Sequence, residues 1–313
     1  MLTVEKVRKR FSKRATKDKK KVATYMEYTS IMQVEYIKRF GKGFKWEDVP
    51  IKDKTYHGWL RPILISSDAL INGRWSYWLD IRTTQKVEGK PIPQLNFHHP
   101  YDEKFRFVSK MIEKCLNPPL NMSFGGYQTF LLFVDWLLYG WGSPLVKEFP
   151  SQIDDSLNEY WYKNFQGDLM LMFPADYFMN IASEMYGGKG FNSNQFYPTP
   201  SVIVEFMVDI LMSGAGREAA KYAKKVEPCC GSGIMLLYMS NWILRLQAVD
   251  IDLLMIKLTH LNGYFYIPWL MGTDDKTNSL LENMYIKYNP KEIEENIKYA
   301  LEINKKGQLA FGF

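Results

Sequence analysis

The sequence has few cysteines and few histidines. Only three cysteines occur in 313 residues, two of them adjacent, so the chain has neither a disulfide framework nor the ligand spacing of a zinc site. Of the four histidines, only His98 and His99 are neighbours, and they lie in a Pro- and Asn-rich segment that is typical of a loop. We therefore expect no metal site, and a reducing, cytoplasmic environment.

Long apolar runs are also absent. No run of about 18 or more apolar residues occurs, which argues against a transmembrane helix and a membrane partner. The N-terminus is charged from the start and lacks an apolar core segment, which argues against a secretory signal. With 46% hydrophobic and 15% aromatic residues, the composition is that of a soluble globular protein.

Positive charge is concentrated at one end of the chain. Residues 1–21 hold ten Lys and Arg against Glu5 and Asp18, a net of +8, whereas the whole chain is +6 and the remainder therefore about −2. Such an arm (residues 1–24) can bind DNA by neutralising phosphates, without sequence preference; the alternative is a solvated tail. The expected phosphate contacts are Lys6, Arg8, Lys9, Arg10, Lys13, Arg14, Lys19, Lys20 and Lys21.

Residues 25–163 are expected to form a mainly helical N-terminal region with a small β-rich insertion at about 50–100. Apolar residues at helical spacing predict helices over 22–48 and within 101–145. Between them, Trp59–Ile65 and Trp75–Ile81 are short β-rich runs, and Asn72-Gly73 is a hairpin signal.

Residues 164–313 hold the patterns with the clearest chemistry. Helices are expected over Leu169–Met185 and Ser201–Met212, and residues 225–252 predict a β-α-β unit with a glycine turn after its first strand. Gly231 and Gly233 let backbone N–H groups approach a ligand. Asp250, about 20 residues on at the tip of the second strand, is placed to accept hydrogen bonds from a ribose diol.

The residues around this turn resemble a known family. Glu-Pro-Cys-Cys-Gly-Ser-Gly at 227–233 is similar to the first cofactor motif of S-adenosylmethionine-dependent DNA N6-adenine methyltransferases, above all the modification subunits of type I restriction systems and their phage relatives. Residues 195–200 resemble the family's Phe-x-Thr-Pro motif, and 248–252 its acidic motif. The likeness covers roughly residues 165–285 and implies an α/β, Rossmann-like methyltransferase core.

The resemblance also implies a cofactor, S-adenosylmethionine, and a set of binding residues. Glu227 would contact the methionyl end, Gly231 and Gly233 would line the turn, Asp250 would hold the ribose hydroxyls, and Asn278 would face the adenine. Glu227 replaces the family's usual Asp and is one methylene longer. The full set is Phe196, Thr199, Glu227, Pro228, Cys229, Gly231, Gly233, Asp250, Ile251 and Asn278.

The family's catalytic Asn/Asp-Pro-Pro-Tyr/Phe motif, which holds a flipped base, has no counterpart after Asp250. Asn289-Pro290-Lys291 lacks the second proline and the aromatic, and it is explained as a helix start that places Ile293, Ile297 and Leu301 on one face. Asn117-Pro118-Pro119-Leu120 precedes the glycine turn by over a hundred residues. The catalytic residue is therefore unknown, with Asn117 and Asn289 as candidates.

The last residues suggest a partner. Gln308, Leu309, Phe311 and Phe313 resemble the peptides by which bacterial replication and repair proteins bind the DNA sliding clamp. The alternative is an edge strand of the protein's own sheet. About 60 residues follow the acidic motif, so we expect the last strands of a methyltransferase sheet to be missing or supplied elsewhere, for example by a partner subunit.

Two functions remain open from the sequence. One is an adenine-N6 DNA methyltransferase with a diverged catalytic loop, favoured by the cofactor motifs. The other is a catalytically inactive, methyltransferase-like protein that binds nucleic acid or a partner, favoured by the missing catalytic motif.

Overall fold

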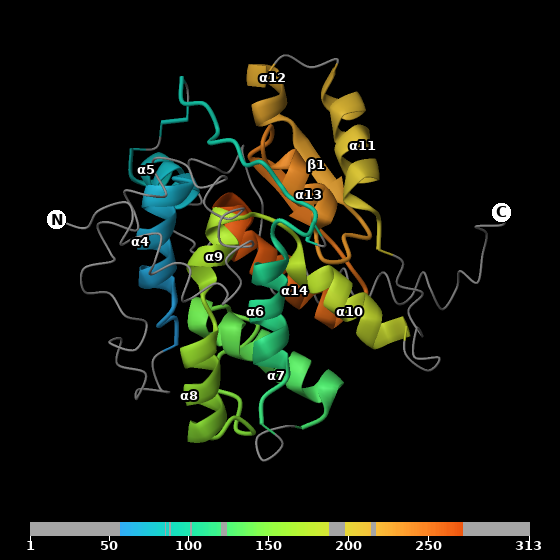
Figure 1. Ribbon diagram of the computed structural model, residues 1–313. Helices are drawn as coiled ribbons and strands as arrows, with labels where there is room; N and C mark the ends of the chain where they lie inside the picture. The colour runs from blue at the N-terminus through green and yellow to red at the C-terminus, as the bar shows by residue number, and fades with distance from the viewer. Residues whose placement is uncertain are drawn as a thin grey trace. The chain divides into compact units, whose positions relative to one another are not determined.

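The computed structural model describes residues 57–84, 86–87, 89–100, 102–119, 124–187, 198–213 and 217–271. These residues are mainly helical, with one pair of strands (Figure 1). The chain separates into two compact units, which are treated one at a time: residues 1–77 with 93–177, and residues 78–92 with 178–313. The second unit thus includes residues 78–92, which the sequence assigned to the N-terminal region.

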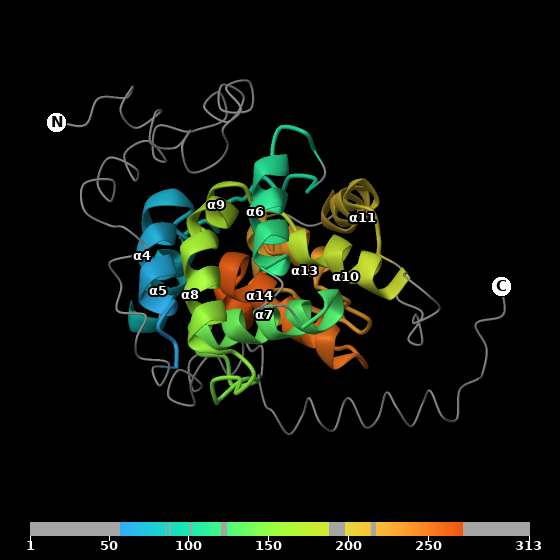
Figure 2. The ribbon, with the colours of Figure 1, turned by 60° about the horizontal axis from the view of Figure 1, so that its bottom comes forward.

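The first unit is helical over its described residues. Helix α6 packs against α7 and α8, and α4 packs against α9, as the two views in Figures 1 and 2 show. The core is aromatic, and two of its buried indoles donate hydrogen bonds: Trp136 Nε1 to Asn158 Oδ1 at 2.8 Å and Trp161 Nε1 to the Cys115 carbonyl at 2.7 Å. The helices are α4 (Arg61–Ile71), α6 (Arg106–Leu116), α7 (Gly126–Trp141), α8 (Asp155–Asn164) and α9 (Gly167–Met172).

The β-rich insertion predicted at about 50–100 is wrong in its described part. Residues Arg61–Ile71 form α4 and Arg74–Thr84 form α5, so Asn72-Gly73 joins two helices and no hairpin forms. Leu60, Leu64, Asp68 and Ile71 are buried at a spacing of three to four residues, which is the helical period. Gly73 ends α4 with a left-handed φ of 71°, the usual conformation after a helix.

Two buried side chains of opposite charge lie where α4 meets α5, and they interact electrostatically. The side chains of Asp68 and Arg74 have no solvent exposure. Asp68 Oδ2 accepts a hydrogen bond from the Trp75 N–H at 2.7 Å and so caps the start of α5, while Arg74 Nε donates to the Pro93 carbonyl at 2.9 Å. Burial raises the pKa of Asp68 to about 7 and lowers that of Arg74 to about 9, and each charge partly offsets the shift of the other.

The second unit contains the β-α-β unit that the sequence predicted. Strands β1 and β2 are parallel, with Lys224 opposite Arg245 and Glu227 opposite Ala248, and α13 connects them. Helix α11 packs against α13 (Figure 2). A complete Rossmann-like sheet stays a prediction. The elements are α10 (Tyr177–Gly187), α11 (Ser201–Ser213), α12 (Arg217–Tyr222), β1 (Lys224–Glu227), α13 (Ile234–Met239), β2 (Arg245–Ala248), α14 (Leu253–Tyr266) and the 3-10 helix η3 (Pro268–Met271).

Two helix predictions near this unit had different outcomes. The helix expected over Ser201–Met212 is confirmed as α11. The single helix expected over Leu169–Met185 is wrong, because the chain forms α9 up to Met172 and α10 from Tyr177. Pro174 explains the break, since it lacks an N–H and disfavours the helical conformation of the residue before it.

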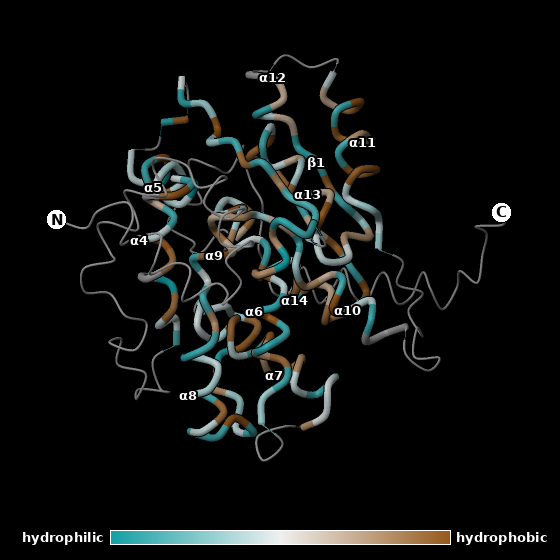
Figure 3. Tube along the Cα trace, in the orientation of Figure 1, coloured by the Kyte–Doolittle hydropathy of each residue, from teal (hydrophilic) through white to brown (hydrophobic). Residues whose placement is uncertain are grey.

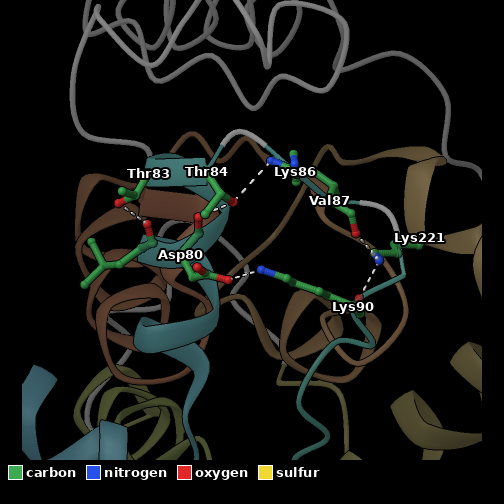
Figure 4. A network of polar contacts seen from close by, with 8 residues as sticks. Asp80, Thr83, Thr84, Lys86, Val87, Lys90 and Lys221 are labelled. Atoms are coloured by element: carbon green, nitrogen blue, oxygen red, sulfur yellow. Dashed lines mark hydrogen bonds and ion pairs between the residues drawn. The ribbon is translucent and has the colours of Figure 1, made fainter.

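Polar contacts hold the segment 86–92 within the second unit (Figure 4). Lys221 of α12 is buried, and its ammonium donates hydrogen bonds to the carbonyls of Val87 and Lys90. The Lys90 side chain in turn pairs with Asp80 of α5. A lysine in α12 therefore binds two carbonyls of a segment that lies some 130 residues earlier in the chain.

Candidate cofactor site

The glycine turn joins the end of β1 to α13 and is fixed by backbone hydrogen bonds. The pairing of the strands continues beyond their ends, because the Val249 N–H donates to the Glu227 carbonyl at 2.9 Å and the Cys230 N–H donates to the Val249 carbonyl at 3.0 Å. The Gly233 N–H then donates to the Cys230 carbonyl at 2.7 Å and closes the turn. Residues 227–233 thus reach the carboxyl end of both strands, next to Val249 and Asp250.

Both glycines have backbone conformations that other residues rarely adopt. Gly231 has φ 53° and Gly233 has φ 86°. A Cβ on Gly233 would also lie 3.1 Å from the Thr259 Cγ2 atom of α14. The close approach of α14 therefore accounts for glycine at position 233 without any ligand.

Substitution of Gly233 by Ala should lower the free energy of unfolding by about 1–3 kcal/mol, from left-handed strain and the Thr259 contact. Gly89→Ala is the matched control, because Gly89 has φ 73° and a Cβ there would meet no atom within 4 Å. Urea titration of both variants measures the difference. Equal losses would show that the contact with Thr259 contributes nothing.

Asp250 lies against the turn. Its Oδ2 accepts the Gly231 N–H at 2.8 Å and its Oδ1 accepts the Asp252 N–H at 2.9 Å. A carboxylate has about four acceptor positions, and these two hydrogen bonds occupy one on each oxygen. Partial burial and the Asp252 carboxylate raise the pKa of Asp250, and the backbone N–H groups of Asp252, Gly231 and Ile251 oppose that rise. The carboxylate can accept a further hydrogen bond from a ligand hydroxyl, such as one of a ribose diol, whereas the Gly231 N–H is already engaged.

Two side chains of α14 donate hydrogen bonds to the turn, and the sequence did not predict this contact. Thr259 Oγ1 donates to the Gly231 carbonyl at 2.8 Å, and Asn262 Nδ2 donates to the Ser232 carbonyl at 2.9 Å. Both side chains are buried in a helix whose other inward residues are mostly apolar. That contrast, two polar residues three apart in an apolar run, is the signal that could have identified them. Asp252 caps this helix, since its Oδ1 accepts the Leu254 N–H at 2.8 Å.

The other predicted residues near the turn are half-buried or exposed to solvent. Glu227 is half-buried, and burial raises the pKa of its carboxyl. Pro228 and Cys229 are exposed, and partial burial, Asp250 and Glu227 all raise the pKa of the Cys229 thiol, which makes it a weak nucleophile at neutral pH. Ile251 is partly exposed beside Asp250. Glu227, Pro228 and Cys229 lie two to four positions before Gly231, and Ile251 follows Asp250, so these residues border the same strand ends.

Other predicted residues lie apart from the turn or outside the described chain. Thr199 is exposed just before α11. Asn117 belongs to the first unit and ends α6, where its Nδ2 donates to the Glu113 carbonyl at 2.8 Å, so it has a complete structural role. Phe196, Asn278, Asn289, the arm residues 1–24 and the tail residues Gln308, Leu309, Phe311 and Phe313 lie outside the described residues.

Of the histidine pair, His98 contacts an aromatic side chain. The His98 ring stacks on Phe105 with ring centroids 4.1 Å apart, and burial lowers its pKa. Within the described part of the chain, no group of three or more His, Cys, Asp or Glu is placed to hold a metal ion.

The chain was compared with family models, with curated proteins and with solved structures, and none of these comparisons gave a match. Over the residues that the structure describes, no helix has both the length and the apolar character needed to span a membrane.

Proposed function

We propose that this protein binds S-adenosylmethionine at the glycine turn and Asp250, and that it is an adenine-N6 DNA methyltransferase with a diverged catalytic loop. The observation that supports this most is the position of the Asp250 carboxylate. It follows a strand parallel to β1, contacts the turn, and is only partly buried. This arrangement suits the two hydroxyls of a ribose.

Each residue of the site has a defined part in this proposal. Asp250 would accept the ribose hydroxyls, and Glu227 would face the methionyl ammonium, which also favours the ionised form of a carboxyl whose pKa burial has raised. Thr259 and Asn262 hold the turn carbonyls and so keep the turn rigid. The cofactor, when bound, would supply a methyl group on a sulfonium for transfer to a nucleophilic amine.

Transfer of labelled methyl groups from S-adenosylmethionine to DNA tests the enzymatic part of the proposal. We expect incorporation into DNA that contains adenine, none into RNA of matched sequence, and loss of incorporation in Asp250→Ala. The variant Glu205→Ala serves as the control, because it removes an exposed carboxylate of the same unit outside the site. Absence of transfer by a wild-type protein that binds the cofactor would show that it is not an enzyme of this class.

One observation favours a second function, a methyltransferase-like binding protein without catalysis. Asn117, one of two candidates for the catalytic asparagine, is used as a helix cap, and its amide donates to the Glu113 carbonyl. In that case cofactor binding would remain and transfer would be absent. The two functions therefore differ in one measured quantity, the rate of methyl incorporation.

The proposed DNA binding depends on contacts between phosphates and the basic arm. Deleting residues 1–21 removes a net charge of +8 and should weaken binding similarly for all DNA sequences, with a shallower dependence on salt. Filter binding over a range of salt concentrations measures both effects. An unchanged affinity and salt slope would mean that the arm does not contact DNA.

Sliding-clamp binding by the tail stays a prediction.

A further inference from the structure

One hydroxyl of α14 contacts two consecutive residues of the glycine turn. Thr259 Oγ1 donates to the Gly231 carbonyl at 2.8 Å and lies 3.4 Å from Cys230 Sγ. A hydroxyl has a single proton, so in the second contact the Cys230 thiol is the donor. Burial raises the pKa of this thiol to about 12, and it therefore keeps its proton at neutral pH. Thr259 thus holds both residues that form the peptide bond between Cys230 and Gly231.

Thr259 lies in a part of α14 where an apolar residue would be expected. It is 2% exposed in a helix whose inward residues are mostly apolar, and Figure 3 shows the hydropathy along the chain. Inside a helix, a threonine hydroxyl often donates to a carbonyl three or four residues earlier. Thr259 instead donates to a carbonyl 28 residues earlier. The contact with the turn therefore accounts for a threonine at this position.

The peptide bond that Thr259 holds is the one that contacts Asp250. Its N–H, that of Gly231, donates to Asp250 Oδ2 at 2.8 Å. Gly231 has φ 53° and no Cβ, so its own backbone restricts the turn less than another residue would. Hydrogen bonds to its N–H and to its carbonyl fix this glycine on both sides. A continuous chain of hydrogen bonds therefore runs from Thr259 through Gly231 to Asp250.

We propose that Thr259 is a positioning residue for Asp250, and that its hydroxyl keeps the Asp250 carboxylate in the orientation that accepts a ligand hydroxyl. It acts through Gly231, whose carbonyl it binds. The effect on cofactor affinity rests on the proposed function. The effect on the carboxylate itself does not, because it is a property of the protein without ligand, so the two effects can be measured separately.

The surroundings of Asp250 give the direction of the expected change. Burial and a neighbouring acid raise the pKa of Asp250, whereas three backbone N–H groups, among them that of Gly231, lower it. A displaced Gly231 N–H would remove one of these lowering contributions, so loss of the Thr259 hydroxyl should raise the pKa of Asp250 further. The titratable side chains around Asp250 belong to Glu227, Cys229, Cys230 and Asp252.

Substitutions of Thr259 in the full chain separate the hydroxyl from the rest of the side chain. Thr259→Val has nearly the same shape but no hydroxyl, whereas Thr259→Ser keeps the hydroxyl and loses the methyl. The NMR shift of the Asp250 carboxyl carbon, followed through a pH titration without ligand, reports the pKa of this group. We expect a higher pKa in Thr259→Val than in the wild type and an unchanged one in Thr259→Ser. Thr259→Ala, which lacks both groups, should behave like Thr259→Val.

Calorimetric titration with S-adenosylmethionine adds the effect on the proposed site. Thr259→Val should bind about three- to tenfold more weakly, the range expected for one lost hydrogen bond. Binding requires the ionised Asp250 carboxylate, so on acidification the affinity of Thr259→Val should fall at a higher pH than that of the wild type. Thr259→Ser should restore both properties. Thr129→Val is the matched control, because Thr129 is a completely buried threonine of α7 in the first unit, and it should change neither.

The same pKa of Asp250 in the wild type and in Thr259→Val would overturn the proposal. An equal rise of that pKa in Thr259→Ser would also overturn it, because the methyl and not the hydroxyl would then be responsible. A higher pKa in Thr259→Val, together with no cofactor binding by the wild type, would support the positioning of Asp250 and contradict the proposed function.

Discussion

Replacing Asp68 by Ala should lower the free energy of unfolding by about 3–5 kcal/mol, because the substitution takes the carboxylate away from a completely buried Arg74. The same change removes the acceptor of the Trp75 N–H at the start of α5. Urea or guanidinium unfolding measures the loss. Both helices of the α4–α5 pair depend on this one carboxylate, so the effect should exceed that of any exposed substitution.

Two further variants separate charge from capping. Asp68→Asn keeps an oxygen acceptor for the Trp75 N–H but has no charge, so it should lose less than Asp68→Ala. The double substitution Asp68→Leu/Arg74→Met removes both buried charges and should be more stable than Asp68→Ala. A loss below about 1 kcal/mol in Asp68→Ala would contradict the account of this pair.

Acidification from pH 7 to pH 4 should destabilise the protein through His260. This residue is buried in α14, and burial lowers its pKa to about 4. An unfolded histidine has a pKa near 6.5, so between these values the unfolded state binds the proton more tightly. The stability that His260 contributes is therefore complete above pH 6.5 and lost as the pH falls through 4, a change on the order of 3 kcal/mol.

Comparison with His260→Gln isolates this effect. Asp68 acts in the opposite direction over the same window, because burial raises its pKa to about 7 and the folded state there holds the proton. The wild type and His260→Gln share the contribution of Asp68, so the difference in unfolding free energy between them should shrink as the pH falls. A difference that stays constant from pH 7 to pH 4 would show that His260 is not buried in its neutral form.

The parts of the fold that the sequence predicted are those with local signals. Gly231 and Gly233 mark a turn because their backbone requires positive φ. Such signals depend on a few neighbouring residues. They placed the β-α-β unit and Asp250 correctly.

The errors have equally physical causes. Trp59–Ile65 and Trp75–Ile81 are rich in residues common in strands, yet burial at helical period placed Arg61–Ile65 in α4 and Trp75–Ile81 in α5. Asn72-Gly73 suits a helix end as well as a hairpin, since both need positive φ at the glycine. Tertiary packing decided between them.

Contacts between distant residues could not be predicted. Thr259 and Asn262 bond turn carbonyls 28 and 30 residues earlier, and Lys221 bonds carbonyls some 130 residues earlier. Nothing in the local pattern specifies these partners. The sequence predicts that the Gly231 N–H faces a ligand, but this group donates to Asp250, 19 residues later in the chain. The local pattern does not specify this partner either.

Calorimetric titration of the wild-type protein with S-adenosylmethionine and with its demethylated product tests the central claim most directly. We predict binding of both ligands at one site per chain. Asp250→Ala should bind at least about tenfold more weakly, because a charge-assisted hydrogen bond contributes about 1.5–3 kcal/mol. Glu205→Ala should bind like the wild type. A folded wild-type protein that gives no heat with either ligand would contradict the assignment of the turn and Asp250 as a cofactor site.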